Sequence, residues 1–255
     1  MQRAAPPETC TRTIKRIFVA FVGMLGLRLD QAAWSPTFII WASLFVATAL
    51  LYGHLFYWGG IKAARALPWA MAYAAVMWVL YYGGLCVVLG TRVRRWMIAR
   101  WGERETQRNF NAVMGIVFMH QGLAQGAVAD CSIGQIAGPP GWLMLGGAIV
   151  LIALGTGVKL WATVTSSLDI YYYNDMLLGR PLSDSGDAIK HGPFKYFKNP
   201  MYGVGNLQGY GSALLIGSWY GLAVAALYHA SLYVFYFVFE RPFVMRTYAS
   251  RPAKA

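Results

Sequence analysis

Long apolar stretches alternate with short basic stretches along this chain of 255 residues. A helix needs roughly 20 predominantly apolar residues to cross the hydrocarbon core of a bilayer. Four stretches meet this test of length and apolarity: 36–57, 68–90, 110–129 and 141–162. The third contains His120, Gln121 and Gln125, and because polar groups are costly in lipid we expect these side chains to face other helices or a water-filled cavity.

A fifth apolar run covers residues 207–239, which is too long for one comfortable span. It is broken by Gly-Ser-Trp-Tyr-Gly at 217–221. We interpret the run as two helices in a tight hairpin. The first arm is too short to cross a bilayer alone, so we expect a re-entrant helix that other protein segments support.

The N-terminal stretch 14–29 is apolar but is interrupted by Lys15, Arg16 and Arg28. It lacks a convincing small-residue cleavage site, which argues against a cleaved signal peptide. An amphipathic helix on the membrane surface fits this pattern better.

The composition supports membrane residence, because 57% of the residues are hydrophobic and only 13% are charged. A soluble protein of this size needs more polar surface. We therefore predict an all-α integral membrane protein with about five to six transmembrane or re-entrant helices. Residues 1–135 would contain the amphipathic helix and three membrane helices, and residues 136–255 a membrane helix, a polar loop, the helical hairpin and a basic tail. Together they would form one membrane domain.

The net charge of +12 could indicate nucleic-acid binding, but the basic residues lie between the apolar runs rather than along one face of a soluble fold. Lys and Arg concentrate before the first span, in 91–109, in 163–206 and after residue 239, and none occurs in 130–140. The positive-inside rule then places both termini and the 163–206 loop on the cytoplasmic side of a multi-pass protein. No nucleic-acid partner is predicted.

A metal site is also not predicted. Cys10, Cys86 and Cys131 lie far apart without a CxxC pair, so neither a disulfide framework nor a zinc site is indicated. His120 and His229 lie in separate apolar segments and lack the i, i+4 spacing of helical metal ligands. We expect them to form structural hydrogen bonds.

The densest group of unusual residues is His-Gly-Pro-Phe-Lys-Tyr-Phe-Lys-Asn-Pro-Met-Tyr-Gly at 191–203. Prolines and glycines make such a loop stiff and let its backbone approach a ligand closely. Its lysines lie where a phosphate could bind. By composition alone, aromatic residues beside lysines are equally typical of a belt at the membrane interface.

This segment resembles the signature of the membrane phospholipid methyltransferases and, more distantly, that of the isoprenylcysteine carboxyl methyltransferases. The family pattern is Gly-Pro-aromatic-basic-Tyr-x-basic-His/Asn-Pro-x-Tyr-x-Gly, followed by a broken apolar hairpin that ends in an acidic residue and proline. Here the pattern runs over 192–203, with Asn199 in the His/Asn position, and continues to Glu240-Arg241-Pro242. The Asn-Pro-Met-Tyr form is similar to the branch that methylates phosphatidylethanolamine. The resemblance covers residues 140–250.

The resemblance implies an enzyme that uses S-adenosylmethionine to methylate the amine of phosphatidylethanolamine or its mono- and dimethyl products towards phosphatidylcholine, releasing S-adenosylhomocysteine. It implies that the cofactor contacts a Gly-x-Gly in the preceding span and acidic residues after the hairpin. Arg241 departs from the family, which usually has a second acid there. The cofactor residues expected from the resemblance are Gly155, Gly157, Asn199, Pro200, Tyr202, Gly203, Glu240 and Arg241.

Methyl transfer from a sulfonium is an in-line displacement, so the enzyme must align donor and acceptor and exclude water. Aromatic faces would stabilise the cationic sulfonium and an ammonium product. The candidates for this aromatic wall are Tyr196, Phe197, Tyr202 and Tyr210.

A protonated ethanolamine must lose a proton before its nitrogen can attack. His191 is the first candidate for the proton acceptor because histidine titrates near neutral pH. Asp187, or Glu240 acting through a water, are alternatives. With Tyr202 and Glu240, His191 completes the expected catalytic group.

The lipid phosphate could be held by Lys195, Lys198 and Arg180, since a cation at the headgroup level attracts an anionic oxygen. The same three residues could instead serve only to set the topology.

Three other functions remain open. A carboxyl methyltransferase of the isoprenylcysteine type is disfavoured by Asn199, where that branch usually has His. A sterol-reductase-like enzyme using a nicotinamide cofactor would share a similar C-terminal arrangement. A non-catalytic lipid-binding scaffold would be compatible with Arg241.

Overall fold

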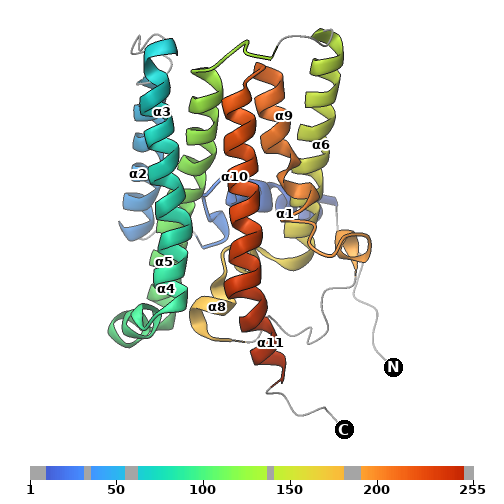
Figure 1. Ribbon diagram of the computed structural model, residues 1–255. Helices are drawn as coiled ribbons and strands as arrows, with labels where there is room; N and C mark the ends of the chain where they lie inside the picture. The colour runs from blue at the N-terminus through green and yellow to red at the C-terminus, as the bar shows by residue number, and fades with distance from the viewer. Residues whose placement is uncertain (1–9, 32–35, 55–62, 137–140, 181–190, 250–255) are drawn as a thin grey trace.

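The computed structural model describes residues 10–31, 36–54, 63–136, 141–180 and 191–249. These residues form helices and the loops between them, with no strand in the ranges described, and the long helices run side by side as a bundle (Figure 1). The predicted all-α membrane fold is therefore confirmed.

The elements are α1 (Cys10–Met24), a 3₁₀ turn (Leu29–Gln31), α2 (Pro36–Gly53), α3 (Ala63–Trp78), a π turn (Val79–Gly83), α4 (Gly84–Gly90), α5 (Val93–Asp130), α6 (Gly141–Ser166), α7 (Leu168–Tyr171), α8 (Asn174–Leu178), 3₁₀ turns (Gly192–Lys195 and Val204–Asn206), α9 (Leu207–Ile216), α10 (Trp219–Phe235), a second π turn (Tyr236–Glu240) and α11 (Arg241–Ala249).

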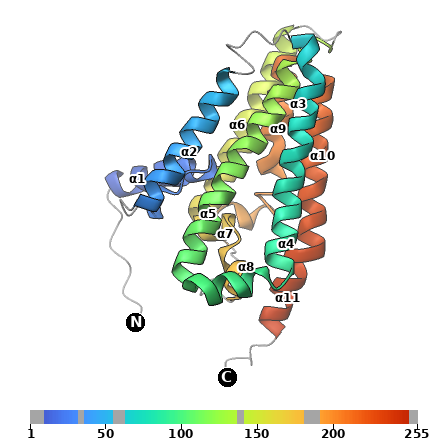
Figure 2. The same cartoon turned by 90° about the vertical axis from the view of Figure 1, so that its left-hand side faces the viewer.

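Five stretches of helix in the described part of the chain are long and apolar enough to cross a membrane. They are Pro36–Gly53, Ala66–Gly90, Val93–Asp130, Gly141–Ser166 and Trp219–Arg246. The predicted spans at 36–57, 68–90 and 141–162 correspond to the first, second and fourth of these. Helix α2 lies at the edge of the bundle beside α1 (Figure 2), and few of its side chains are buried.

Helix α5 is longer than the apolar pattern predicts. Residues 91–109 were expected to form a basic loop, but the helix begins at Val93, turns at Gly102 with φ 76° and ψ 164°, and then continues to Asp130. The residues after Gly102 include good helix formers such as Glu, Arg and Gln. They bury Thr106 and Phe110 on one side, so tertiary packing stabilises a helix where charge alone indicated a loop.

The predicted broken hairpin is present as α9 and α10. Gly217 ends α9 with φ 73°, a conformation that glycine adopts without strain. Ser218 then caps α10, because its Oγ accepts a hydrogen bond from the Gly221 N–H at 2.8 Å. The same Oγ lies 2.5 Å from the Ser132 Oγ, so the hairpin turn is joined to the end of α5.

The second arm of the hairpin does not end near residue 239, where the apolar run ends. It passes through the π turn into α11 and continues to Ala249. Pro242 cannot donate a backbone hydrogen bond to the preceding turn, and the π turn immediately before it accommodates this loss. Glu240 and Arg241 therefore lie within a continuous helical path rather than at a helix end.

Helix α9 has ten residues, so at 1.5 Å per residue it spans about 15 Å, half of a bilayer core of roughly 30 Å. It packs closely along α6, as Figure 1 shows. A Cβ added at Gly155 would lie 2.3 Å from the Gln208 backbone nitrogen, and one added at Gly211 would lie 2.8 Å from the Ala148 carbonyl oxygen. Glycines thus allow the two backbones to meet, as is typical of helix pairs in membranes.

Several of the segments predicted to be basic lie at one end of the bundle, whereas α1 crosses the bundle nearer its middle. The junction between α4 and α5, the short helix α8 and the helix α11 lie together there (Figure 1). Arg28, which is 6% exposed, bonds Asp30 at 2.6 Å and Asp169 at 2.9 Å. These ion pairs fasten the turn after α1 to α7.

We expect Gly155→Ala to lower the free energy of unfolding in detergent by about 1–3 kcal/mol, because the added methyl group must push α9 away from α6. Circular dichroism during denaturant titration would measure it. Gly147→Ala is the matched control on the same helix, because a Cβ there meets nothing within 4 Å. Equal stability of the two variants would contradict the close contact.

Candidate functional site

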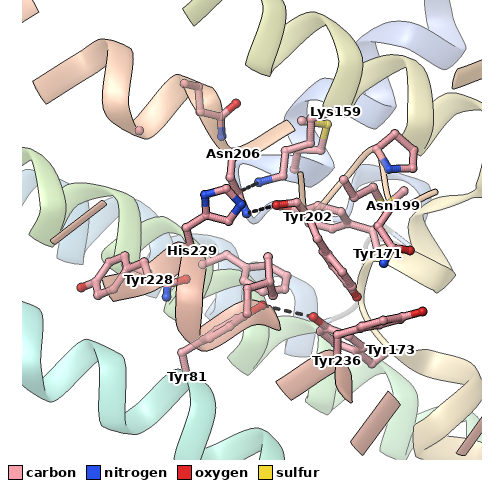
Figure 3. Close-up of a pocket in the computed structure, with 18 of the residues that line it drawn as sticks. Tyr81, Lys159, Tyr171, Tyr173, Asn199, Tyr202, Asn206, Tyr228, His229 and Tyr236 are labelled. Carbon is pink, nitrogen blue, oxygen red and sulfur yellow. Dashed lines mark hydrogen bonds between the residues drawn. The ribbon is translucent and has the colours of Figure 1, made fainter. Parts of the chain in front are cut away.

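A cavity of about 1290 Å³ lies inside the bundle. Its walls come from the middle of α5, the end of α6, the loop before α9, the inner face of α10 and the second π turn, as Figure 3 shows in part. The end of α1 and Phe45 of α2 also reach it. Most of the lining is apolar or aromatic, with a few polar groups, which is typical of a site for a small molecule.

An acidic group lies at one end of this cavity. The π turn directs Glu240 inward, and the Tyr202 hydroxyl donates a hydrogen bond to Glu240 Oε2. Burial raises the pKa of Tyr202, and the nearby charge of Glu240 raises it further. The phenol therefore stays protonated at neutral pH and holds the carboxylate in a fixed position.

A basic group lies on the other side of Tyr202. The Lys159 Nζ of α6 donates to Asn206 Oδ1 at 3.1 Å, and Asn206 Nδ2 donates to the Tyr202 carbonyl oxygen at 3.1 Å (Figure 3). Gly205 permits this approach, because a Cβ there would lie 3.2 Å from the Lys159 Cβ and 2.8 Å from the Pro200 carbonyl oxygen. Tyr202 thus links a cation to a carboxylate across the cavity wall.

Aromatic rings form much of the remaining lining. The Tyr81 and Tyr173 hydroxyls lie 3.5 Å apart, and the Tyr202 ring packs edge-on against Tyr236 at 5.7 Å. Ring faces of this kind attract cations, with a larger effect where water is excluded. The tyrosines that line the cavity are Tyr81, Tyr82, Tyr171, Tyr173, Tyr202, Tyr228 and Tyr236.

The polar residues of the third apolar stretch have two different environments. Gln121 and Gln125 line the cavity, and Gln125 Nε2 donates to the Gly209 carbonyl at 2.9 Å. His120 instead bonds the Tyr73 hydroxyl at 2.5 Å. Both arrangements remove the polar groups from contact with lipid.

The structure brings together part of the site that the sequence predicts. Tyr202 is the member of the expected aromatic wall that lines the cavity, whereas Tyr196 is 67% exposed and Phe197 is 37% exposed. Tyr210 lies just behind the lining and bonds His229 Nδ1 at 3.1 Å. The predicted site residues that line the cavity are Lys198, Asn199, Pro200, Tyr202, Glu240 and Arg241.

The other predicted site residues lie elsewhere. His191 and Lys195 are exposed, and Arg180 forms an ion pair with Glu103. Gly203 lies beside the lining, where an added Cβ would be 3.2 Å from the Tyr233 hydroxyl, whereas Gly155 lies in the contact between α6 and α9 and Gly157 is exposed. Asp187 lies outside the described residues.

Several cavity residues were not among the predicted site residues. Lys159 lies inside the predicted span 141–162, where an ionisable group is itself a sign of function. His229 was interpreted as a structural histidine, and its bond to Tyr210 agrees with that, but its ring also lines the cavity. Asn206 and Tyr236 carry no signal in the sequence, because only the fold turns them inward.

Comparisons with known proteins match the C-terminal part of the chain. Residues 143–251 match the model of the phospholipid methyltransferase family. A phosphatidylethanolamine N-methyltransferase of Clavispora lusitaniae (strain ATCC 42720) is 30% identical over 152 residues, which cover 56% of this chain. The matched region spans 17% of the length of that curated relative. No solved structure matches.

We expect Asn206→Leu to lower the free energy of unfolding by about 2 kcal/mol, since it removes the acceptor of a charged donor inside the bundle. Adding Lys159→Met should recover part of this loss, because no unpaired ammonium remains. Chemical denaturation in detergent would measure the double-mutant cycle. Ser212→Ala, an exposed position on α9, is the control, and strictly additive losses would contradict the coupling.

Proposed function

Because residues 143–251 place this chain in the phospholipid methyltransferase family, we propose that it transfers a methyl group from S-adenosylmethionine to the amine of phosphatidylethanolamine or of its mono- and dimethyl products. Repeated transfer leads towards phosphatidylcholine and releases S-adenosylhomocysteine. The observation that carries the proposal is the cavity within the membrane bundle, where Glu240, Tyr202 and several tyrosine rings converge inside the matched segment.

The lining fits a cationic methyl donor and a lipid amine. S-adenosylmethionine, when bound, supplies an electrophilic methyl group on a sulfonium. The rings of Tyr173, Tyr202 and Tyr236 line the cavity, and their faces would stabilise such a cation and the ammonium product. Asn199 and Pro200 add a rigid backbone edge to the same wall, and Gly203 lets Tyr233 approach it.

Glu240 is the acidic side chain among the described cavity residues. We assign to it the binding of an ammonium group and, for the lipid acceptor, removal of the proton that blocks attack. Tyr202 positions it by donating a hydrogen bond to Oε2. His191, the first candidate from the sequence, lies exposed and away from the lining, so it would need a chain of waters to act.

Among the cations in the lining, Lys198 and Arg241 come from the site residues predicted from the sequence and are candidate partners of the lipid phosphate. Arg241 lies with its guanidinium carbon 6.0 Å from the Phe237 ring centroid. Lys195 and Arg180 would act only at a distance, through the headgroup layer. Gly155 would support the cofactor site indirectly by holding α9 against α6, and Gly157 makes no such contact among the described residues.

The proposal places this reaction at the cytoplasmic face of the membrane. The basic segments that share one end of the bundle support that orientation. The N-terminus, the loop before α9 and the C-terminus would then face the cytoplasm.

Purified protein in nanodiscs, incubated with methyl-labelled S-adenosylmethionine, should transfer label to phosphatidylethanolamine or to one of its methylated forms. Thin-layer chromatography of extracted lipid would measure it, with each of the three acceptors offered separately. A prenylcysteine acceptor serves as a control for the carboxyl methyltransferase alternative. No labelled phospholipid with all three acceptors would reject the proposed function.

Glu240→Gln should lower kcat by about 100-fold or more, because the amide cannot accept the proton or balance an ammonium charge. Tyr202→Phe should have a smaller effect in the same direction, since the carboxylate remains but loses its positioning donor. Initial rates at saturating donor and lipid would measure both. The control is Glu105→Gln, whose carboxylate pairs with Arg108 outside the cavity, and wild-type rates in Glu240→Gln would contradict the assignment.

A further inference from the structure

Lys159 lies in the interior of the bundle, and none of the described carboxylates pairs with its ammonium group. The ion pairs among the described residues join Arg28 to Asp30 and Asp169, Arg108 to Glu105, and Arg180 to Glu103. Lys159 belongs to none of them. From Lys159, α6 continues to Ser166, which is about 10 Å of helix, so the residue lies well inside the span.

The ammonium group of Lys159 has more N–H donors than hydrogen-bond partners among the described residues. It carries three N–H groups, and its partner among the described residues is Asn206 Oδ1 at 3.1 Å. The side chain lines the cavity. A charge inside a membrane is costly unless an opposite charge or strong hydrogen bonds compensate it. The structure thus presents a partly satisfied cation to the space where a ligand would bind.

His229 offers a second polar atom in the same region. Its Nε2 is buried near the Tyr202 backbone and makes no well-formed hydrogen bond among the described residues, while Tyr210 contacts Nδ1 at 3.1 Å. Tyr233 stacks on the ring at 5.3 Å and fixes its plane. Figure 3 shows the His229 ring beside the ends of Lys159 and Asn206. If the Tyr210 hydroxyl donates to Nδ1, Nε2 carries a proton and is a donor.

Tyr202 fixes the separation between this cation and Glu240. Its carbonyl oxygen accepts from Asn206, which holds Lys159, and its hydroxyl donates to Glu240. One residue therefore connects a basic end and an acidic end of one cavity. A ligand that carries both a negative and a positive group fits such an arrangement better than a ligand of single charge.

We infer that Lys159 and His229 form an anion subsite that binds the negatively charged oxygens of a zwitterionic ligand whose ammonium group faces Glu240. The identity of the ligand rests on the proposed function, which supplies two sources of such oxygens. One is the carboxylate of the methyl donor, and the other is the phosphate of the lipid. Lys159 binds the charge, and His229 donates a hydrogen bond from Nε2.

A first experiment tests whether the subsite binds the carboxylate of the methyl donor. Calorimetry compares the affinity of the protein for S-adenosylhomocysteine with its affinity for the decarboxylated analogue. If the subsite takes the carboxylate, the wild-type protein binds the complete molecule about 10-fold more tightly or better, as expected for a hydrogen-bonded charge pair. Lys159→Met should abolish this discrimination, and Lys159→Arg should restore part of it. Lys15→Met, an exposed position on α1, should keep the wild-type discrimination.

A second experiment tests whether the subsite binds the lipid phosphate, by measuring the KM for phosphatidylethanolamine at saturating methyl donor. If the subsite takes the phosphate, Lys159→Met raises this KM by about 10-fold, while its discrimination between the two donor analogues stays as in the wild-type protein. Lys159→Arg separates binding from folding, because it keeps the charge at the same position. If Lys159→Met changes neither quantity, the anion subsite is overturned.

Failure of the proposed function would look different, because the wild-type protein itself would then neither bind S-adenosylhomocysteine nor methylate lipid. The subsite would still be testable through retention of phosphatidylethanolamine during detergent exchange, followed by mass spectrometry. Greater retention by the wild-type protein than by Lys159→Met would support an anion subsite without methyl transfer. Equal retention would overturn it.

Discussion

The short helix α9 depends on its contact with α6, and much of the site depends on that contact. A helix of ten residues cannot cross a bilayer, and its end groups need partners inside the protein because lipid offers none. Gly155, Gly205 and Gly211 bring the loop and α9 against α6 at distances that no side chain would allow. This contact places Asn206 beside Lys159 and carries Tyr202 to Glu240.

The contact between α6 and α9 also produces a cavity with a basic end and an acidic end inside an apolar bundle. Charges are expensive in this environment, so the charged groups that the structure describes beside the cavity need partners. Glu240 is held by Tyr202, Lys159 by Asn206, and the Arg241 side chain lies over Phe237. A ligand bound between the aromatic rings would displace water from them, which would strengthen its electrostatic interactions with these charges.

The change from a second acid to Arg241 has a physical interpretation in this arrangement. Because the helix continues through the π turn into α11, Arg241 lies within a helical path rather than at a helix end, and its exposed side chain also borders the cavity together with Glu240. A cation there reduces the negative charge of the acidic end and adds a partner for anionic oxygens. Together with Lys159 it makes the cavity suited to ligands that carry both signs of charge.

The amino-acid sequence by itself determined the membrane class, the main spans and the broken hairpin, because run length, Gly217 and Ser218 are local signals that act without distant partners. The motif also indicated the resemblance to the phospholipid methyltransferases and pointed to residues that line the cavity, including Tyr202, Asn199 and Glu240. Only the tertiary structure decided which residues meet. In the structure His191 lies outside the cavity lining, whereas Lys159, Asn206 and His229 belong to it. These positions depend on how closely the backbones of α6, α9 and α10 approach one another, and the periodicity of a single segment does not encode that approach.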